Sequence, residues 1–275
     1  MLILPTCSAV RMKIGDTRVA RYTSADVVAL VADRLADPRS AHLAVGSVNL
    51  DHLHHFRPGC DRVFNQSEWL WLADGAPVAW RGARLAGTPW PRVTGADLLV
   101  PLLDAAVAQR APIGFLGGLP TTHERLSAVL TRRHPQAEPP RFWAPARAEI
   151  ESPGASAQLA AQIKAAGVRL LVVGLGKPRQ ELWIQEYAQS TGAAVSLAFG
   201  AAGDFLAGVV DRAPEVYRRY GLEWLYRLRQ EPRRLARRYL VQGPAAFARL
   251  RHASLEPAGS ASVTPSSAEQ RGRRP

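Results

Sequence analysis

Short apolar runs that end in glycine alternate with amphipathic segments along this chain, and this alternation constrains its fold more than any other feature. The clearest apolar run is 168–173, which ends in Gly174-Leu-Gly176 and precedes a helical pattern over 181–190. Strands that are separated by helices pair in parallel, since each helix carries the chain back across the sheet. The sequence therefore predicts an α/β fold, in which a Rossmann-like, largely parallel sheet is flanked by helices.

The same alternation continues on both sides of this run. Apolar runs bounded by turn residues predict strands, and apolar residues at helical spacing behind a capping residue predict helices. The expected strands are 41–45, 69–73, 112–116, 168–173 and 193–198, and the expected helices start near 24, 97, 122 and 181. Residues 1–22 should be irregular or form a hairpin. Ligands should bind at the carboxyl ends of the strands, where the glycine-rich turns fall.

Positive charge is concentrated at the end of the chain. Residues 212–275 hold 14 arginines, no lysine and five acidic residues, whereas the preceding 211 residues hold 21 basic and 18 acidic ones. Within 221–240, apolar residues that include Trp224 and Tyr239 recur at helical spacing among the arginines. A basic amphipathic helix of this kind suits an anionic membrane surface or a polyphosphate ligand. We therefore expect an α/β core over 1–211, a basic amphipathic helical C-terminal appendage over 212–251, and a disordered tail over 252–275.

The composition is that of a globular protein, with 47% apolar residues. No stretch approaches the roughly 18–20 apolar residues of a membrane-spanning helix, and the first residues lack the basic start and apolar core of a signal peptide. Cys7 and Cys60 are too few for a disulfide framework or a cysteine-rich zinc site. These features predict a cytoplasmic protein.

The turn from Gly174 to Glu181 lies between an expected strand and an expected helix. Its glycines let a ligand approach the backbone, and a helix N-terminus favours a phosphate. Lys177 adds positive charge, and the Gln180 amide can both donate and accept hydrogen bonds. The spacing matches neither a Walker A loop nor a dinucleotide-binding fingerprint. An ordinary strand-to-helix turn is the alternative.

Two further strand ends carry polar side chains. Asp74 precedes Gly75 at the end of an apolar run, where an acid is well placed to act as a general base; an Asp-Gly hairpin turn is the alternative. Ser47 and Asn49 follow another run, where such residues commonly form turns or caps.

One cluster of histidines could be interpreted as a metal-binding site. The cluster contains Asp51, His52, His54, His55 and Cys60. It has neither a helical His pair at the spacing that zinc enzymes use nor a pair of cysteines two residues apart. We therefore expect no metal site.

Taken in order, the strand ends and turns of this chain resemble the WecG/TagA/CpsF family, which is glycosyltransferase family 26. The resemblance spans about 15–245. The segments that carry it are Ser47-Val-Asn49, Ala73-Asp74-Gly75, Arg92-Val-Thr-Gly95 with Asp97, Phe115-Leu-Gly-Gly118, Gly174-Leu-Gly-Lys-Pro-Arg-Gln-Glu181, Asp204-Phe-Leu-Ala-Gly208, Arg212-Ala-Pro214, Gly221-Leu-Glu-Trp-Leu-Tyr-Arg227, Glu231-Pro-Arg-Arg234 and Arg237-Arg-Tyr239. The chain departs from the family in having Ser47 where a threonine is usual and Gly203 where a phenylalanine is usual.

The resemblance implies an inverting transferase that needs no metal or other cofactor. Its donor would be a UDP-sugar with an N-acetylhexosamine-type sugar, such as N-acetylmannosamine or its uronic acid. Its acceptor would be a polyprenyl-diphosphate-linked sugar, used for teichoic-acid-type, common-antigen or exopolysaccharide synthesis. The enzyme would be peripheral on the inner face of the cell membrane, would not bind nucleic acid, and could be a homo-oligomer.

The resemblance also implies roles for individual residues. Asp74 would be the catalytic base, and Ser47 and Asn49 would line the reaction centre. The donor would be bound by Gly95, Gly117, Gly118, Gly174, Gly176, Lys177, Pro178, Gln180 and Glu181. Phosphate or lipid would be bound by Arg212, Arg227, Arg234 and Arg237.

Two other classes of protein fit parts of the sequence. The pI of about 10.7 and the arginine-rich end suggest a nucleic-acid-binding α/β protein, although the charge lies in one appendage that also carries apolar residues. The α/β pattern suggests a Rossmann-type oxidoreductase, although the dinucleotide-binding fingerprint is missing.

Overall fold

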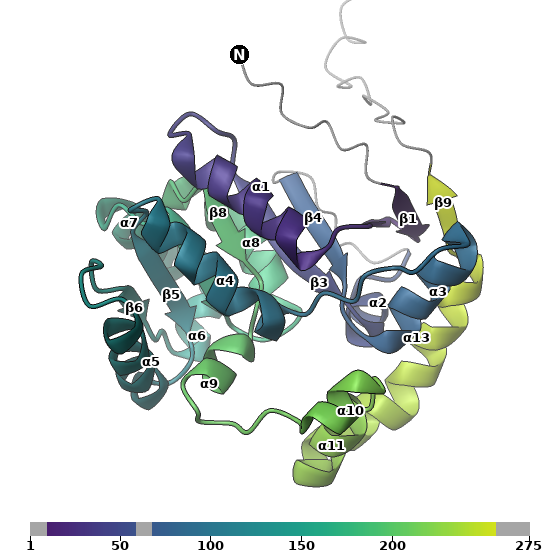
Figure 1. Cartoon of the computed structure of the whole chain (residues 1–275). Coiled ribbons are helices and arrows are strands. Elements are labelled where there is room, and N and C mark those ends of the chain that lie inside the picture. Colours follow the sequence, from purple (N-terminus) through teal and green to yellow (C-terminus); the bar gives the residue numbers. More distant parts are fainter. Residues whose placement is uncertain (1–9, 59–67, 257–275) are drawn as a thin grey trace, which may run out of the picture.

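The computed structural model describes residues 10–58 and 68–256, including the side chains of all of these except Arg218 and Arg234. Within these ranges the chain forms one nine-stranded sheet with helices on both faces (Figure 1). The strands are β1 (Arg11–Ile14), β2 (Thr17–Ala20), β3 (Leu43–Val48), β4 (Glu68–Ala73), β5 (Ile113–Gly117), β6 (Arg141–Trp143), β7 (Leu170–Gly174), β8 (Val195–Leu197) and β9 (Ser254–Glu256). Cys7 and Cys60 lie outside the described residues.

Most of the sheet is parallel. The strand order is β6-β5-β7-β8-β3-β4-β2-β1-β9, and the strands from β6 to β2 all run in the same direction. The antiparallel β1–β2 hairpin and β9 complete one edge. The predicted Rossmann-like α/β fold is therefore confirmed, and so is a hairpin within 1–22.

Helices cover both faces of the parallel strands. On one face, α1 (Ser24–Ala36) and α4 (Gly95–Ala108) bury leucines and valines against β3, β5, β7 and β8. On the other face, α7 (Pro153–Ala165) and α8 (Arg179–Thr191) enclose a second core cluster around Leu171 and Trp183. The remaining helices before residue 212 are α2 (Leu50–His55), α3 (Ala76–Ala86), α5 (Pro120–Arg133), α6 (Arg147–Glu151) and α9 (Ala202–Leu206).

The hairpin alternative for Asp74-Gly75 is wrong, because this dipeptide connects β4 to α3. Gly75 has φ +113°, a backbone conformation that favours glycine, and Pro77 lies in the first turn of the helix. The chain therefore turns into a helix at the end of a parallel strand, which is where an α/β fold places its ligand-binding residues.

The C-terminal appendage consists of several short helices. These are α10 (Glu215–Arg219), α11 (Glu223–Gln230), α12 (Pro232–Ala236), the π-helical segment η1 (Arg237–Gln242), α13 (Gly243–Arg249) and the 3₁₀ turn η2 (Leu250–His252). The single helix expected over 221–240 is divided at Glu231, where φ is −130° and ψ is 61°. The cause is Pro232, since proline disfavours the helical conformation of the residue before it.

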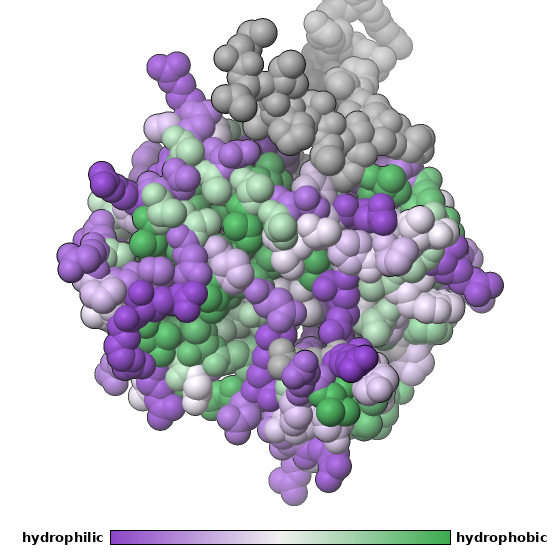
Figure 2. Space-filling model, viewed as in Figure 1, coloured by the Kyte–Doolittle hydropathy of each residue, from purple (hydrophilic) through white to green (hydrophobic). Residues whose placement is uncertain are grey.

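The appendage packs onto the sheet and is not a detached unit. Ala246, Leu250 and Ala253 are buried in a core cluster with Met12 and Trp90. After α13 and η2 the chain enters β9, which pairs with β1. The prediction of disorder is therefore wrong for residues 252–256, and the rest of the predicted tail lies outside the described residues. Figure 2 shows hydrophobic and hydrophilic residues mixed on the surface of the lobe that α10 and α11 form at the bottom of the view.

Gly46 of β3 leaves room for two large aromatic rings of the neighbouring strand β4. It pairs with Trp71 of β4, whose ring stacks on Trp69 at a centroid distance of 4.2 Å. A Cβ atom at Gly46 would overlap the Trp71 ring. Gly46→Ala should therefore lower the free energy of unfolding by about 1–3 kcal/mol, the usual cost of overpacking a core.

Chemical denaturation measures this effect, and Gly154→Ala is the matched control. Gly154 lies in the first turn of α7, where a Cβ atom would meet nothing within 4 Å. The control should be neutral or slightly stabilising, because alanine favours the helix. Equal stabilities of the two variants would contradict the packing described for Gly46.

Candidate functional site

One cavity of about 820 Å³ lies over the carboxyl ends of β3, β4, β7 and β8. Its floor comes from the strand ends, and its walls come from the first turns of α3 and α4, from α9, and from α11, η1 and α13 of the appendage. It brings together ten residues that sequence analysis assigned to a site: Ser47, Asn49, Asp74, Gly95, Gly174, Gly176, Lys177, Gln180, Arg212 and Arg227. The candidate site is thus built jointly by the sheet and the appendage.

The other assigned residues are not among those that line the cavity. Gly117 lies against the backbone of Gly174, and its carbonyl oxygen is 2.7 Å from Nε2 of His123. Gly118 and Pro178 lie nearby without lining the cavity, and Glu181 is completely buried. Arg237 is exposed. The side chain of Arg234 lies outside the described part of the structure.

Asp74 lies at the end of β4, beside the end of β3. Its backbone N–H donates to the Val48 carbonyl at 2.9 Å, which continues the strand pairing into the site. Burial raises the pKa of the Asp74 carboxyl; the Ser47 hydroxyl bond, the Lys177 and Arg92 charges and Asn49 oppose this rise. A half-buried carboxylate whose proton affinity is increased is suited to accept a proton from a bound ligand.

Asn49 caps a helix and also faces Asp74. Its Oδ1 accepts the N–H of His52 at 3.1 Å, which caps α2. This bond fixes the orientation of the amide, so Nδ2 points toward the Asp74 carboxylate at 3.5 Å. The capping role and the site role that the sequence left as alternatives therefore occur together.

Gln180 presents an unused carbonyl oxygen. Its Nε2 donates to the Ala198 carbonyl at 2.8 Å and to Glu181 Oε1 at 3.2 Å. Its Oε1 is buried and has no hydrogen-bond partner within the described residues. Gly200 leaves room beside this atom, since a Cβ there would lie 2.7 Å from Oε1. A ligand N–H or O–H in the cavity could satisfy this acceptor.

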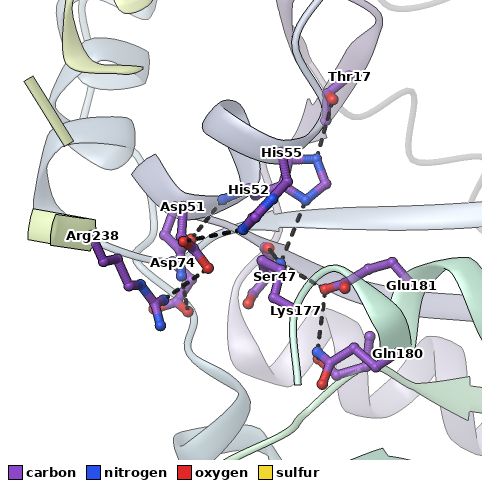
Figure 3. Close-up of polar contacts among 12 residues, drawn as sticks. Thr17, Ser47, Asp51, His52, His55, Asp74, Lys177, Gln180, Glu181 and Arg238 are labelled. Atoms are coloured by element: carbon purple, nitrogen blue, oxygen red, sulfur yellow. Dashed lines mark hydrogen bonds and ion pairs between the residues drawn. The ribbon is translucent and has the colours of Figure 1, made fainter. Parts of the chain in front are cut away.

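Lys177 is directed into the protein. Its side chain is 9% exposed, and Nζ lies 2.7 Å from Glu181 Oε1 and 2.9 Å from the Ser47 carbonyl oxygen (Figure 3). Lys177 therefore joins the β7–α8 turn to the end of β3.

Two arginines of the cavity, Arg212 and Arg238, lie beside carboxylates. Arg212 contacts Asp97 at 2.7 Å and Glu223 at 3.8 Å. Arg238 pairs with the buried Asp51 at 3.1 Å, which connects η1 to α2 (Figure 3). An anionic ligand that enters the cavity therefore meets cations that are already held in place.

Several residues that line the cavity were not assigned to it from the sequence. These are Asp51, Arg92, Asp204, Glu223 and Arg238. Arg92, Asp204, Glu223 and Arg238 belong to segments that carried the family resemblance, so membership of those segments was an available signal. Asp51 lies outside these segments, and its pairing with Arg238 depends on how the appendage folds back.

Gly221 explains how Glu223 reaches the site. Its φ is +70°, and a Cβ there would lie 2.5 Å from Cβ of Ala76, next to the β4–α3 turn. This close approach places α11 beside Asp74. Burial raises the pKa of Glu223, the Arg212 and Arg92 charges oppose the rise, and the negative charge of Asp74 adds to it.

Within residues 10–58 and 68–256, no three His, Cys, Asp or Glu side chains are grouped so that they could hold a metal ion. His52 is completely buried between Trp71 and Phe56, at ring-centroid distances of 4.5 and 4.7 Å. Burial, followed by the Lys177 charge, lowers the pKa of His52 well below its ordinary value, so its ring is neutral. Cys60 lies outside the described residues.

The fold is that of an α/β protein with a cavity at the carboxyl ends of its parallel strands, which is where such folds bind their ligands. Comparison with protein families matches residues 12–259 to the glycosyl transferase WecG/TagA/CpsF family. The match covers nearly the whole chain, and the chain belongs to this family. The predicted resemblance is thus confirmed, and the protein is a glycosyltransferase. No helix in the described ranges is long and apolar enough to span a bilayer.

Asp74→Asn tests the burial of the carboxyl through the pH dependence of stability. Because the folded-state pKa of Asp74 is raised, ionisation destabilises the fold above that pKa, and protonation removes the cost as the pH falls through it. The variant should therefore melt at a higher temperature than wild type at about pH 7, and the difference should shrink as the pH falls. Thermal unfolding followed by circular dichroism measures this.

Asp104→Asn is a control with the opposite sign. A hydrogen bond from Arg133 lowers the pKa of Asp104 in the folded protein. The Asp104 carboxylate therefore stabilises the fold at pH values above its unfolded-state pKa, and this stabilisation is lost as the pH falls through the folded-state pKa. Asp104→Asn should melt below wild type at about pH 7 and approach it in acid. If Asp74→Asn also melted below wild type at about pH 7, the conclusion that burial raises the pKa of Asp74 would be wrong.

Proposed function

We propose that the protein is an inverting glycosyltransferase with a UDP-sugar donor and a polyprenyl-diphosphate-linked sugar acceptor. The transferred sugar is of the N-acetylhexosamine type, such as N-acetylmannosamine or its uronic acid, and the product enters cell-surface polysaccharide or teichoic-acid-type synthesis. The observation that carries the proposal is the half-buried Asp74 carboxylate in a cavity that arginines line. Family membership supports the transfer of a sugar.

The reaction is a single displacement. The acceptor hydroxyl oxygen attacks the anomeric carbon of the donor sugar, and its proton passes to the Asp74 carboxylate. The new glycosidic bond forms as the bond from the anomeric carbon to the β-phosphate oxygen breaks. The electron pair of that bond leaves with UDP, and the configuration at the anomeric carbon inverts.

Arginines stabilise the departing UDP. Arg92, Arg212, Arg227 and Arg238 line the cavity, and cationic side chains that are fixed in advance stabilise the negative charge that develops on the leaving phosphate. Asp97 and Asp51 hold Arg212 and Arg238 in position before the donor binds. We therefore propose that transfer needs neither a metal ion nor another cofactor.

The appendage suits an enzyme that works on a lipid-linked acceptor. Its exposed apolar side chains are Val216, Tyr220, Leu222, Trp224, Leu225, Leu240, Val241 and Phe247. Trp224 and Phe247 also line the cavity, so the same surface connects the outside to the reaction site. Apolar side chains among arginines favour an anionic membrane surface. We propose that the enzyme is cytoplasmic and binds the inner face of the cell membrane.

Asp74→Asn should lower turnover by roughly 10²–10⁴-fold while UDP binding stays near wild type, because the variant loses a general base and keeps the arginines. Turnover is measured with a UDP-sugar and a soluble diphosphate-linked acceptor analogue, and UDP binding by calorimetry. Asp33→Asn, an exposed change on α1, is the control. A folded Asp74→Asn variant with wild-type turnover would show that Asp74 is not the base.

The same assay in EDTA tests metal independence. Wild-type turnover should persist in EDTA. Activity that disappears in EDTA and returns with Mg²⁺ or Mn²⁺ would overturn this part of the proposal.

Leu240→Ser with Val241→Ser tests membrane binding without disturbing the core. These side chains are 60% and 65% exposed, so the double variant should fold like wild type and keep its turnover on the soluble acceptor. Its sedimentation with anionic liposomes should fall several-fold, since burial of a large aliphatic side chain contributes roughly 1.5–3 kcal/mol.

Trp80→Ser is the matched control, because Trp80 is 55% exposed on α3 in the body of the protein. It should sediment like wild type. If Trp80→Ser reduced liposome binding as much as the appendage variant does, the proposed membrane surface would be wrong.

A further inference from the structure

Lys177 and Glu181 form an ion pair that is nearly removed from solvent. Nζ and Oε1 are 2.7 Å apart, and the two side chains are 9% and 0% exposed. Burial of two charges is costly, and their attraction offsets this cost only with good geometry and further hydrogen bonds. The partners of the Lys177 ammonium therefore show what the pair does.

All three N–H groups of the ammonium have protein partners. Besides Glu181, these are the Ser47 carbonyl oxygen at 2.9 Å and Nδ1 of His52 at 3.5 Å. The lowered pKa makes His52 neutral, and we assign the tautomer in which Nδ1 accepts from the ammonium, because an ammonium can only donate. In this tautomer Nε2–H donates to Thr17 Oγ1 at 3.3 Å (Figure 3). An ammonium has only three donors. None is left for a phosphate of the donor, although Lys177 lies at the wall of the cavity.

The Lys177 ammonium affects the ends of β3 and β4, which carry Ser47 and Asp74. The bond to the Ser47 carbonyl holds the end of β3, which carries the hydroxyl and the amide that face Asp74. The Lys177 charge also favours the ionised form of Asp74. The other groups that face Asp74 are the Ser47 hydroxyl, the Asn49 amide, Arg92 and, from α11, Glu223.

We propose that Lys177 is a positioning residue of the transfer reaction. Glu181 and the end of β3 hold its ammonium, which supplies positive charge to Asp74 and makes no bond to the donor's phosphates. This inference rests on the proposed function and changes the role that the sequence suggested for Lys177, which was donor binding.

Lys177→Met in the full chain distinguishes a positioning role of Lys177 from a role in binding the donor's phosphates. A lost charge-assisted bond to phosphate would weaken UDP binding about tenfold or more, whereas a positioning role leaves the UDP dissociation constant within about threefold of wild type. Turnover should fall roughly 10–100-fold, with KM for the donor little changed. The acidic limb of the pH–rate profile should move to higher pH, because Asp74 loses a nearby positive charge.

Lys164→Met is the matched control, since Lys164 is an exposed lysine at the end of α7. It should leave UDP affinity, turnover and the pH profile unchanged. UDP binding weakened tenfold in Lys177→Met, but not in Lys164→Met, would overturn the inference in favour of phosphate binding.

A second variant provides the same test if Lys177→Met does not fold. Removing Lys177 alone leaves the Glu181 carboxylate buried without a counter-charge, which strongly destabilises a fold. Lys177→Met with Glu181→Leu removes both charges and should fold, because replacing a buried pair with apolar residues is commonly neutral or stabilising. It should show the same unchanged UDP affinity and the same shifted pH profile.

A readout independent of activity separates this inference from the proposed function. The Asp74 carboxyl carbon, assigned by comparison with Asp74→Asn, can be titrated by NMR. Its pKa should be higher in the double variant than in wild type. Wild-type protein that transfers no sugar would refute the function alone, whereas an unchanged Asp74 titration in the double variant would refute the role of Lys177.

Discussion

The return of the C-terminal segment to the sheet is the interaction on which the site depends. Strand β9 pairs with β1, and α13 and η2 bury Ala246 and Leu250 against the same end of the sheet. These contacts hold η1 and α11 over the carboxyl ends of the parallel strands, where they form walls of the cavity. Without this anchor the cavity over the strand ends would lose the walls that the appendage supplies. The core and the appendage are therefore parts of one structural unit.

Charges around the cavity are paired across elements that are distant in sequence. Arg238 of η1 meets Asp51 of α2, and Arg212 meets Asp97 of α4. Each pair fixes a cation that would otherwise be mobile, and each connects the appendage to the core. In the proposed reaction, such preorganisation would lower the reorganisation needed when the negatively charged leaving group departs. The same contacts therefore close the site and prepare it for chemistry.

The fold was predictable because its signals are local. An apolar run such as 168–173, followed by a glycine turn, has few alternatives to a buried strand. The expected strands and the main helices occur within a few residues of their predicted places. The errors arose where a local pattern was incomplete: Pro232 divides the expected C-terminal helix, and β9 forms only because β1 offers it a partner.

The sequence by itself determined the order of strands and helices, the polar residues at the strand ends and the membership of a glycosyltransferase family. Only the tertiary structure decided which charges meet. Lys177 resembled a phosphate ligand as a basic residue in a glycine-rich turn, yet its ammonium is used by Glu181 and the Ser47 carbonyl. Glu223 reaches Asp74 only because Gly221 lets two backbones approach closely. Electrostatic interactions depend on distance and burial, and neither follows from separation along the chain.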